Sequence, residues 1–105
     1  MGAASEAPMI TEIVTFALPP GISKSELLDK YNATVPRWRA NADLIRKTYL
    51  YDPVTNRGGG IYLWKTKEAA LAAHDAEWCQ MATQMYGSAP QFAYFDTMFI
   101  IDNGV

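Results

Sequence analysis

Several features that would place this chain in a specialised class of protein are missing from it. It has a single cysteine, Cys79, so no disulfide can form within the chain. Its longest apolar runs, such as 98–101, are far shorter than the roughly 20 residues that span a bilayer, and no secretory leader follows Met1. Nine Lys and Arg residues against eleven Asp and Glu residues give a net charge of -2, without a basic stripe. These absences argue against a disulfide scaffold, a membrane protein and a duplex nucleic-acid binder, and they favour a small cytoplasmic domain.

The motifs of the common catalytic classes are also missing. One histidine and one cysteine are too few for the usual zinc sites. There is no nucleophile elbow, phosphate-binding loop or dinucleotide fingerprint. The three glycines at 58–60 open a predicted strand and do not lead into a helix, so they do not form a phosphate cradle. These absences argue against a zinc site and against a bound nucleotide cofactor.

What is present is the composition of one ordinary globular domain. The chain has 105 residues, of which 50% are hydrophobic and 19% are charged, and a single core is sufficient at this length. Residues 1–8 are small and polar without periodicity, so we predict a disordered tail there. Residues 9–105 then form a single domain.

Hydrophobic periodicity and turn residues divide that domain into six elements. Ser23 and Glu26 form a capping box at the start of the first helix. Pro36 lies inside this helix and predicts a kink or a break near Val35. The predicted elements are strand 9–18, helix 24–40, strand 42–51, strand 58–65, helix 67–86 and strand 91–101.

This order of elements predicts an α+β ferredoxin-like fold, in which a four-stranded antiparallel sheet carries two helices on one face. The uncovered face of such a sheet usually carries polar residues. Here strand 58–65 places Ile61 and Leu63 on one side, and Tyr62 and Trp64 on the other. Because both faces are apolar, we expect the uncovered face to pair with a second copy in a homodimer.

The single histidine of the chain, His74, falls on an apolar stripe of the second predicted helix. Spacing alone favours a packed core histidine at such a position. The alternative is an incompletely filled helix–sheet layer, in which aromatic walls bind a flat apolar ligand and His74 exchanges a proton near neutral pH. The stripe of the second helix is Leu71, His74, Trp78, Met81 and Met85, and that of the first is Leu27, Tyr31, Val35, Trp38 and Ala42.

The strand 59–64 (GGIYLW), with Lys67-Glu68-Ala69-Ala70 after it, resembles the dimeric α/β-barrel superfamily. Within that superfamily the chain is most similar to the YdhR-type monooxygenases, which are related to the antibiotic-biosynthesis monooxygenases. Residues 42–49 (ADLIRKTY) resemble that branch's pGL..K.y stretch, with Ala-Asp where Pro-Gly is usual. The resemblance covers residues 9–102, and it implies two sheets face to face in a dimer with one pocket per subunit.

The resemblance also implies an activity, the oxidation of a small phenolic, quinol or polyketide-like compound by O2 without metal, flavin or haem. A base removes a phenolic or enolic proton, and the resulting anion passes an electron to O2. His74 would be that catalytic base, and it would have to face an open pocket. The alternative is a non-catalytic dimeric module that binds a small apolar ligand. Haem degradation is less favoured, since the one histidine would have to be the axial ligand. The expected substrate-binding walls are Tyr31, Trp38, Tyr62, Trp64 and Trp78.

Overall fold

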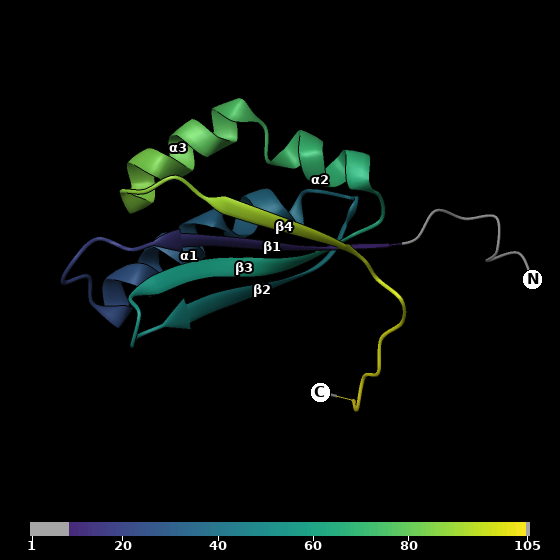
Figure 1. Cartoon of the computed structure of the whole chain (residues 1–105), viewed down its shortest axis with the longest axis horizontal. Helices are drawn as coiled ribbons and strands as arrows, with labels where there is room; N and C mark the ends of the chain where they lie inside the picture. Colours follow the sequence, from purple (N-terminus) through teal and green to yellow (C-terminus); the bar gives the residue numbers. More distant parts are fainter. Residues whose placement is uncertain (1–8, 105) are drawn as a thin grey trace, which may run out of the picture.

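The chain folds into a four-stranded antiparallel sheet with helices on one face (Figure 1). The computed structural model describes residues 9–104, so the tail predicted at 1–8 lies outside the described residues. The strand order is β2-β3-β1-β4 and every neighbouring pair is antiparallel. The predicted ferredoxin-like fold is confirmed. The elements are β1 (Ile10–Ala17), α1 (Lys24–Arg39), β2 (Leu44–Asp52), β3 (Arg57–Trp64), α2 (Lys67–Ala73), α3 (Ala76–Tyr86) and β4 (Gln91–Asp96).

The central strand β1 supplies the middle of the core. It pairs with β3 on one side and with β4 on the other. Its side chains alternate, so that Ile10, Glu12, Val14 and Phe16 are buried while the residues between them are partly exposed. Because a strand turns successive side chains to opposite faces, the four buried residues share the face that the helices cover. One of them is an acid.

Helix α1 begins as the sequence predicts and does not break at its proline. The Ser23 hydroxyl accepts from the Glu26 amide at 3.0 Å, and the Glu26 carboxylate accepts from the Ser23 amide at 2.9 Å. The helix continues through Pro36 to Arg39, so of the predicted kink or break the break does not occur. Pro36 is exposed and stands one turn from the end of the helix. Because proline has no amide N–H, the helix loses one i→i−4 hydrogen bond there without ending.

The predicted second helix is in fact two helices. Asp75 is extended and its carboxylate accepts from the Trp78 amide at 2.9 Å, which starts α3 as a new helix. His74 therefore lies between α2 and α3, with φ -109° and ψ 53°. The break shifts the helical phase, so Leu71 and Met81 are 50% and 38% exposed and the predicted inward stripe holds only in part.

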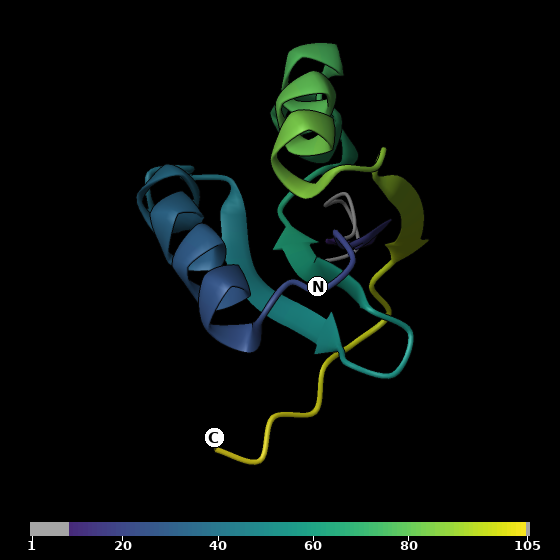
Figure 2. The ribbon, with the colours of Figure 1, turned by 90° about the vertical axis from the view of Figure 1, so that its left-hand side faces the viewer.

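The last strand ends at Asp96, five residues before the predicted end. Within residues 9–104 the one strand beside it is β1, whose first paired residue, Ile10, lies opposite Asp96. One further bond joins the Thr97 amide to the Met9 carbonyl at 2.8 Å. Beyond it the chain leaves the sheet, and residues 97–104 run on the side away from the helices (Figure 2).

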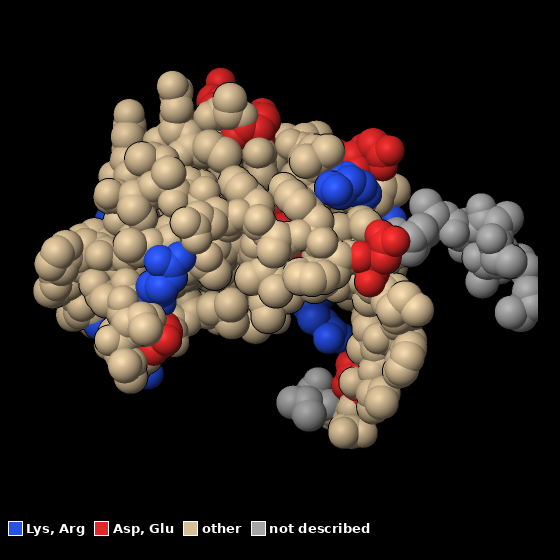
Figure 3. Space-filling view, viewed as in Figure 1, with Lys and Arg blue, Asp and Glu red and all other residues tan. Residues whose placement is uncertain are grey.

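The uncovered face of the sheet is apolar, as the sequence predicts. The registers place Ile13 beside Ile61 and Ala93, and Thr11 beside Leu63 and Phe95. Phe95 is 56% exposed there. On the side that Figure 3 shows, acidic and basic residues are scattered over a largely uncharged surface. None of the helices within residues 9–104 has the length and apolar character needed to span a membrane.

A substitution at Gly59 tests the close approach of β3 to β1. Gly59 has φ +153°, and a Cβ there would lie 1.9 Å from the Val14 carbonyl oxygen. We expect Gly59→Ala to lower the free energy of unfolding by more than about 2 kcal/mol, because two backbones would have to separate. Gly21, with φ +78° and open space around it, is the matched control. Gly21→Ala should cost about 1 kcal/mol, and equal losses in chemical denaturation would contradict the prediction.

Candidate functional site

A buried Glu12–His74 pair lies at the centre of the helix–sheet layer. Nδ1 of His74 lies 2.8 Å from Oε1 and 2.9 Å from Oε2 of Glu12. Nε1 of Trp64 donates to Oε1 of Glu12 at 2.8 Å. Glu12 and Trp64 have no exposed surface, and the His74 side chain has none either. A buried carboxylate is stable only when donors satisfy it, and these two ring nitrogens do so.

The His74 ring is enclosed by aromatic side chains. Its centroid lies 4.3 Å from that of Trp78, 4.6 Å from that of Tyr62 and 5.3 Å from that of Trp38. The rings of Trp64 and Phe92 complete the enclosure at 6.0 and 5.6 Å. This arrangement makes His74 part of a dry aromatic cluster.

The hydrogen bonds of His74 leave one ring nitrogen free to accept a proton. When Nδ1 donates to the Glu12 carboxylate, Nε2 carries the lone pair. Nε2 is buried, and among residues 9–104 it is the one buried side-chain polar atom without a hydrogen-bond partner. Within the same residues, no three His, Cys, Asp or Glu side chains gather as metal ligands would.

A cavity of about 150 Å³ lies next to this cluster, between the helices and the sheet. A space of that size accommodates a benzene-sized molecule. Its lining is mainly aromatic and sulfur-containing, with one amine, Lys47, and the Thr34 hydroxyl and Arg37 beside it. The apolar part of the lining includes Phe16, Trp38, Tyr62, Trp78, Met81, Met85 and Tyr86.

Three of the six residues expected at the site line this cavity, namely Trp38, Tyr62 and Trp78. The other three are buried but are not among its lining residues. Trp64 is bonded to Glu12 as described above. The Tyr31 hydroxyl donates to the Leu50 carbonyl at 2.8 Å and accepts from the Gly59 amide at 3.0 Å. These two hydrogen bonds join α1 to the sheet. His74 contacts rings of the cavity wall but does not line the cavity. The sequence analysis expected it to face an open pocket.

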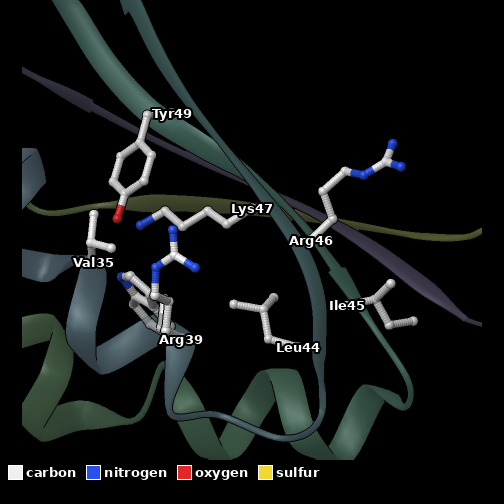
Figure 4. Close-up of a pocket in the computed structure, with 8 residues that line it drawn as sticks. Val35, Arg39, Leu44, Ile45, Arg46, Lys47 and Tyr49 are labelled. Carbon is white, nitrogen blue, oxygen red and sulfur yellow. The ribbon is translucent and has the colours of Figure 1, made fainter. Parts of the chain in front are cut away.

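A second, more open hollow of about 450 Å³ lies along α1 and β2 and shares two residues with the cavity, Trp38 and Lys47. In Figure 4, Lys47 and Arg39 point into this hollow, and the Tyr49 hydroxyl lies toward the Lys47 amine. Arg46 points away from it and binds Asp102 at 3.1 Å instead.

Lys47 is the most perturbed base of the site. Burial lowers the pKa of its ammonium from 10.5 to about 7, and the negative charge of Glu12 acts in the opposite direction. The ring faces around its Nζ also favour the charged form. Nζ lies 4.1 Å from the centroid of Tyr49 and 4.6 Å from those of Trp38 and Tyr62.

Two tyrosines at the site are held in their neutral form. Burial, followed by the Glu12 charge, raises the pKa of Tyr62 far above its ordinary value. The same two causes raise the pKa of Tyr94, which lies opposite Glu12 in β4, to about 12. Neither phenol therefore acts as a base near neutral pH.

Sequence reasoning missed Glu12 and Lys47, although each has a signal in its strand. In β1 the alternating positions 10, 12, 14 and 16 are apolar except for Glu12. In β2, Lys47 alternates with Tyr49 and Tyr51 on the face toward the helices. A charged residue at an inward position of an alternating strand needs a partner or a function.

No protein family model and no curated protein matches the chain. Solved structures do match it over most of its length. A protein of unknown function from Nitrosomonas europaea has a TM-score of 0.72 at 13% identity, over 96% of this chain and 100% of its own. SnoaB, a cofactor-independent oxygenase from Streptomyces nogalater, has a TM-score of 0.65 at 17% identity, over 90% and 98%. The ActVA-Orf6 monooxygenase of Streptomyces coelicolor, solved with Nanaomycin D, has a TM-score of 0.67 at 14% identity, over 92% and 94%.

The chain shares the fold of these oxygenases. Identities this low establish a common fold and carry no residue roles across. The fold implied by the resemblance to the antibiotic-biosynthesis monooxygenases is thus confirmed, while the YdhR-type branch stays a prediction.

A double-mutant cycle tests the Glu12–His74 pair. His74→Leu leaves a buried carboxylate with one donor, and Glu12→Leu leaves two buried N–H groups without an acceptor. We expect each single change to lower the free energy of unfolding by about 3 kcal/mol or more. The double variant, which buries no unpaired charge, should lose less than the sum of the two. Additive losses in chemical denaturation at pH 7 would show that the two side chains are not coupled.

Proposed function

We propose that this protein is a cofactor-independent monooxygenase that oxidises a small phenolic or quinol-like compound with O2. The observation that carries the proposal is the aromatic cavity of about 150 Å³, which Lys47 lines. Two of its wall residues, Tyr62 and Trp78, pack against the His74 ring of the buried Glu12–His74 pair. The monooxygenase and the oxygenase with the same fold lend it support, as an analogy of fold.

The reaction requires little beyond a dry pocket and a base. A base takes the hydroxyl proton of the substrate, and the electron-rich anion transfers an electron to O2. One oxygen atom ends in the ring as a carbonyl and the other leaves as water, so that a phenol and O2 give a quinone and water. The substrate supplies every electron, and so the scheme needs no cofactor.

His74 is the proposed proton acceptor, through Nε2. Glu12 holds Nδ1 and stabilises the imidazolium that forms when Nε2 takes a proton. Because the rings of Trp78 and Tyr62 lie between 4 and 5 Å from that of His74, the substrate ring reaches Nε2 only when one of these side chains changes its rotamer. Trp38, Tyr62 and Trp78 are the proposed substrate walls.

A second candidate function is a non-catalytic module that binds a small apolar ligand. It is favoured by one observation, that His74 does not line the cavity. It uses the same aromatic walls and needs no base. The two functions differ in whether O2 is consumed.

Oxygen uptake with His74→Gln distinguishes them. The amide of Gln can still donate to Glu12 but cannot take the proton of a phenol. With phenol, 4-methoxyphenol or 1-naphthol as substrate, we expect the variant to consume O2 about 100-fold more slowly than the wild type. Mass spectrometry with ¹⁸O2 should find one labelled atom in the wild-type product.

Leu71→Gln, at a site 50% exposed on α2, is the control. Ligand binding without O2 uptake by the wild type would favour the binding module.

We also propose that two copies pair through the uncovered sheet face. The registers bring Ile13, Ile61, Leu63 and Phe95 together on that face. The chain beyond β4 adds Met98, Phe99 and Ile101, which are 86%, 77% and 77% exposed. A surface with this much exposed apolar area is typical of an interface between subunits.

A charge on the proposed interface tests the dimer. Phe95→Glu should convert the protein from dimer to monomer, because pairing would bury two unpaired carboxylates. Val54→Glu is the control, since Val54 is 91% exposed in the turn between β2 and β3. Light scattering after size exclusion measures the mass. A monomeric wild type, or a Phe95→Glu variant that remains dimeric, would contradict the proposal.

A further inference from the structure

Lys47 lies where the aromatic cavity meets the more open hollow. It lines both, and Trp38 is the other residue that they share. A molecule entering the cavity from the hollow would therefore pass the Lys47 amine. Its Nζ is held in place by the faces of Trp38, Tyr49 and Tyr62 at 4.1–4.6 Å.

Within the part of the chain that the structure describes, the amine has no counter-ion of its own. Among residues 9–104 no carboxylate forms an ion pair with Lys47. The nearby acid, Glu12, already accepts from Trp64 and His74. The other cation that points into the hollow, Arg39, adds positive charge (Figure 4). A partly buried amine without an anion beside it is a place where an anionic group of a ligand gains an ion pair.

We propose that Lys47 is the anion-binding group of this cavity, and that it holds the ionised oxygen of a hydroxyaromatic ligand whose ring lies against Trp38 and Tyr62. The inference rests on the proposed function for the cavity and names the group that recognises the hydroxyl. The inference concerns the ionisation of the bound ligand, which can be measured without the oxidation reaction.

The chemistry is a proton transfer followed by ion pairing. The phenol O–H bond breaks, and its proton passes to water in the probe titration and to Nε2 of His74 in the proposed oxidation. The phenolate that remains pairs with the Lys47 ammonium. No electron moves in this step. With its pKa at about 7, Lys47 is present in both forms near neutral pH. The titratable and charged groups around it are Glu12 on β1, Arg37 and Arg39 on α1, Tyr49 on β2 and Tyr62 on β3.

The probe is 4-nitrophenol, whose phenolate is yellow and whose phenol is nearly colourless. Absorbance titrations from pH 5 to 9 with saturating protein give the pKa of the bound probe. An opposite charge in contact lowers such a pKa by about one unit or more, a tenfold preference for the phenolate. We expect this lowering with the wild type and none with Lys47→Met. Lys47→Arg, which keeps the charge, should retain part of it. The neutral analogue 4-nitroanisole should bind the wild type and Lys47→Met equally.

Lys67→Met is the matched control, because Lys67 lies 4.6 Å from the Tyr94 ring centroid and lines neither hollow. It should behave as the wild type does. Three outcomes would each overturn the inference. The pKa of bound 4-nitrophenol could be lowered equally by Lys47→Met, it could be unshifted with the wild type, or the probe could fail to bind. Phenolate binding that depends on Lys47 without O2 uptake would refute the monooxygenase and leave this inference standing. If Lys47→Met leaves O2 uptake unchanged and the pKa of the probe is not shifted, the Lys47 inference is refuted and the monooxygenase proposal stands.

Discussion

The carboxylate of Glu12, fully buried in the central strand β1, is the constraint on which the helix–sheet layer depends. A buried negative charge must be met by donors, and here Trp64 and His74 each donate from an aromatic ring nitrogen. Trp64 comes from the neighbouring strand and His74 from the link between two helices. The pair therefore fixes the position of α2 and α3 over the sheet, and large rings fill the space around it.

The break between α2 and α3 follows from the same arrangement. Asp75 starts a new helix by accepting from the Trp78 amide, which places His74 in a short link. In a continuous helix, His74 and Trp78 would lie one turn apart on one face. In the link, His74 lies over Glu12 while Trp78 packs against the His74 ring at 4.3 Å. Trp78 can then belong to both the cluster and the cavity wall.

The polar groups near the cavity are of two kinds. Glu12 and His74 are paired with each other, and Lys47 has no such partner within the described residues, a difference that the sequence alone does not show. The Glu12–His74 pair lies behind the aromatic wall. The two side chains hydrogen-bond to each other, and Trp64 donates to Glu12. Lys47 is at the boundary with the open hollow and has no acid paired with it among residues 9–104. A ligand in the cavity can contact the amine directly, whereas it contacts the imidazole only after a ring has moved.

The amino-acid sequence determined the order of the elements, the apolar character of both sheet faces and the inward position of His74, since each depends on local periodicity and capping. It did not show where the last strand would end, because that depends on the length of its partner β1. Only the tertiary structure decided that Glu12 and His74, 62 residues apart, would meet, and that Lys47 would lie under three rings. Those contacts depend on strand register and on how the helices dock, and neither is encoded in the spacing of neighbouring residues.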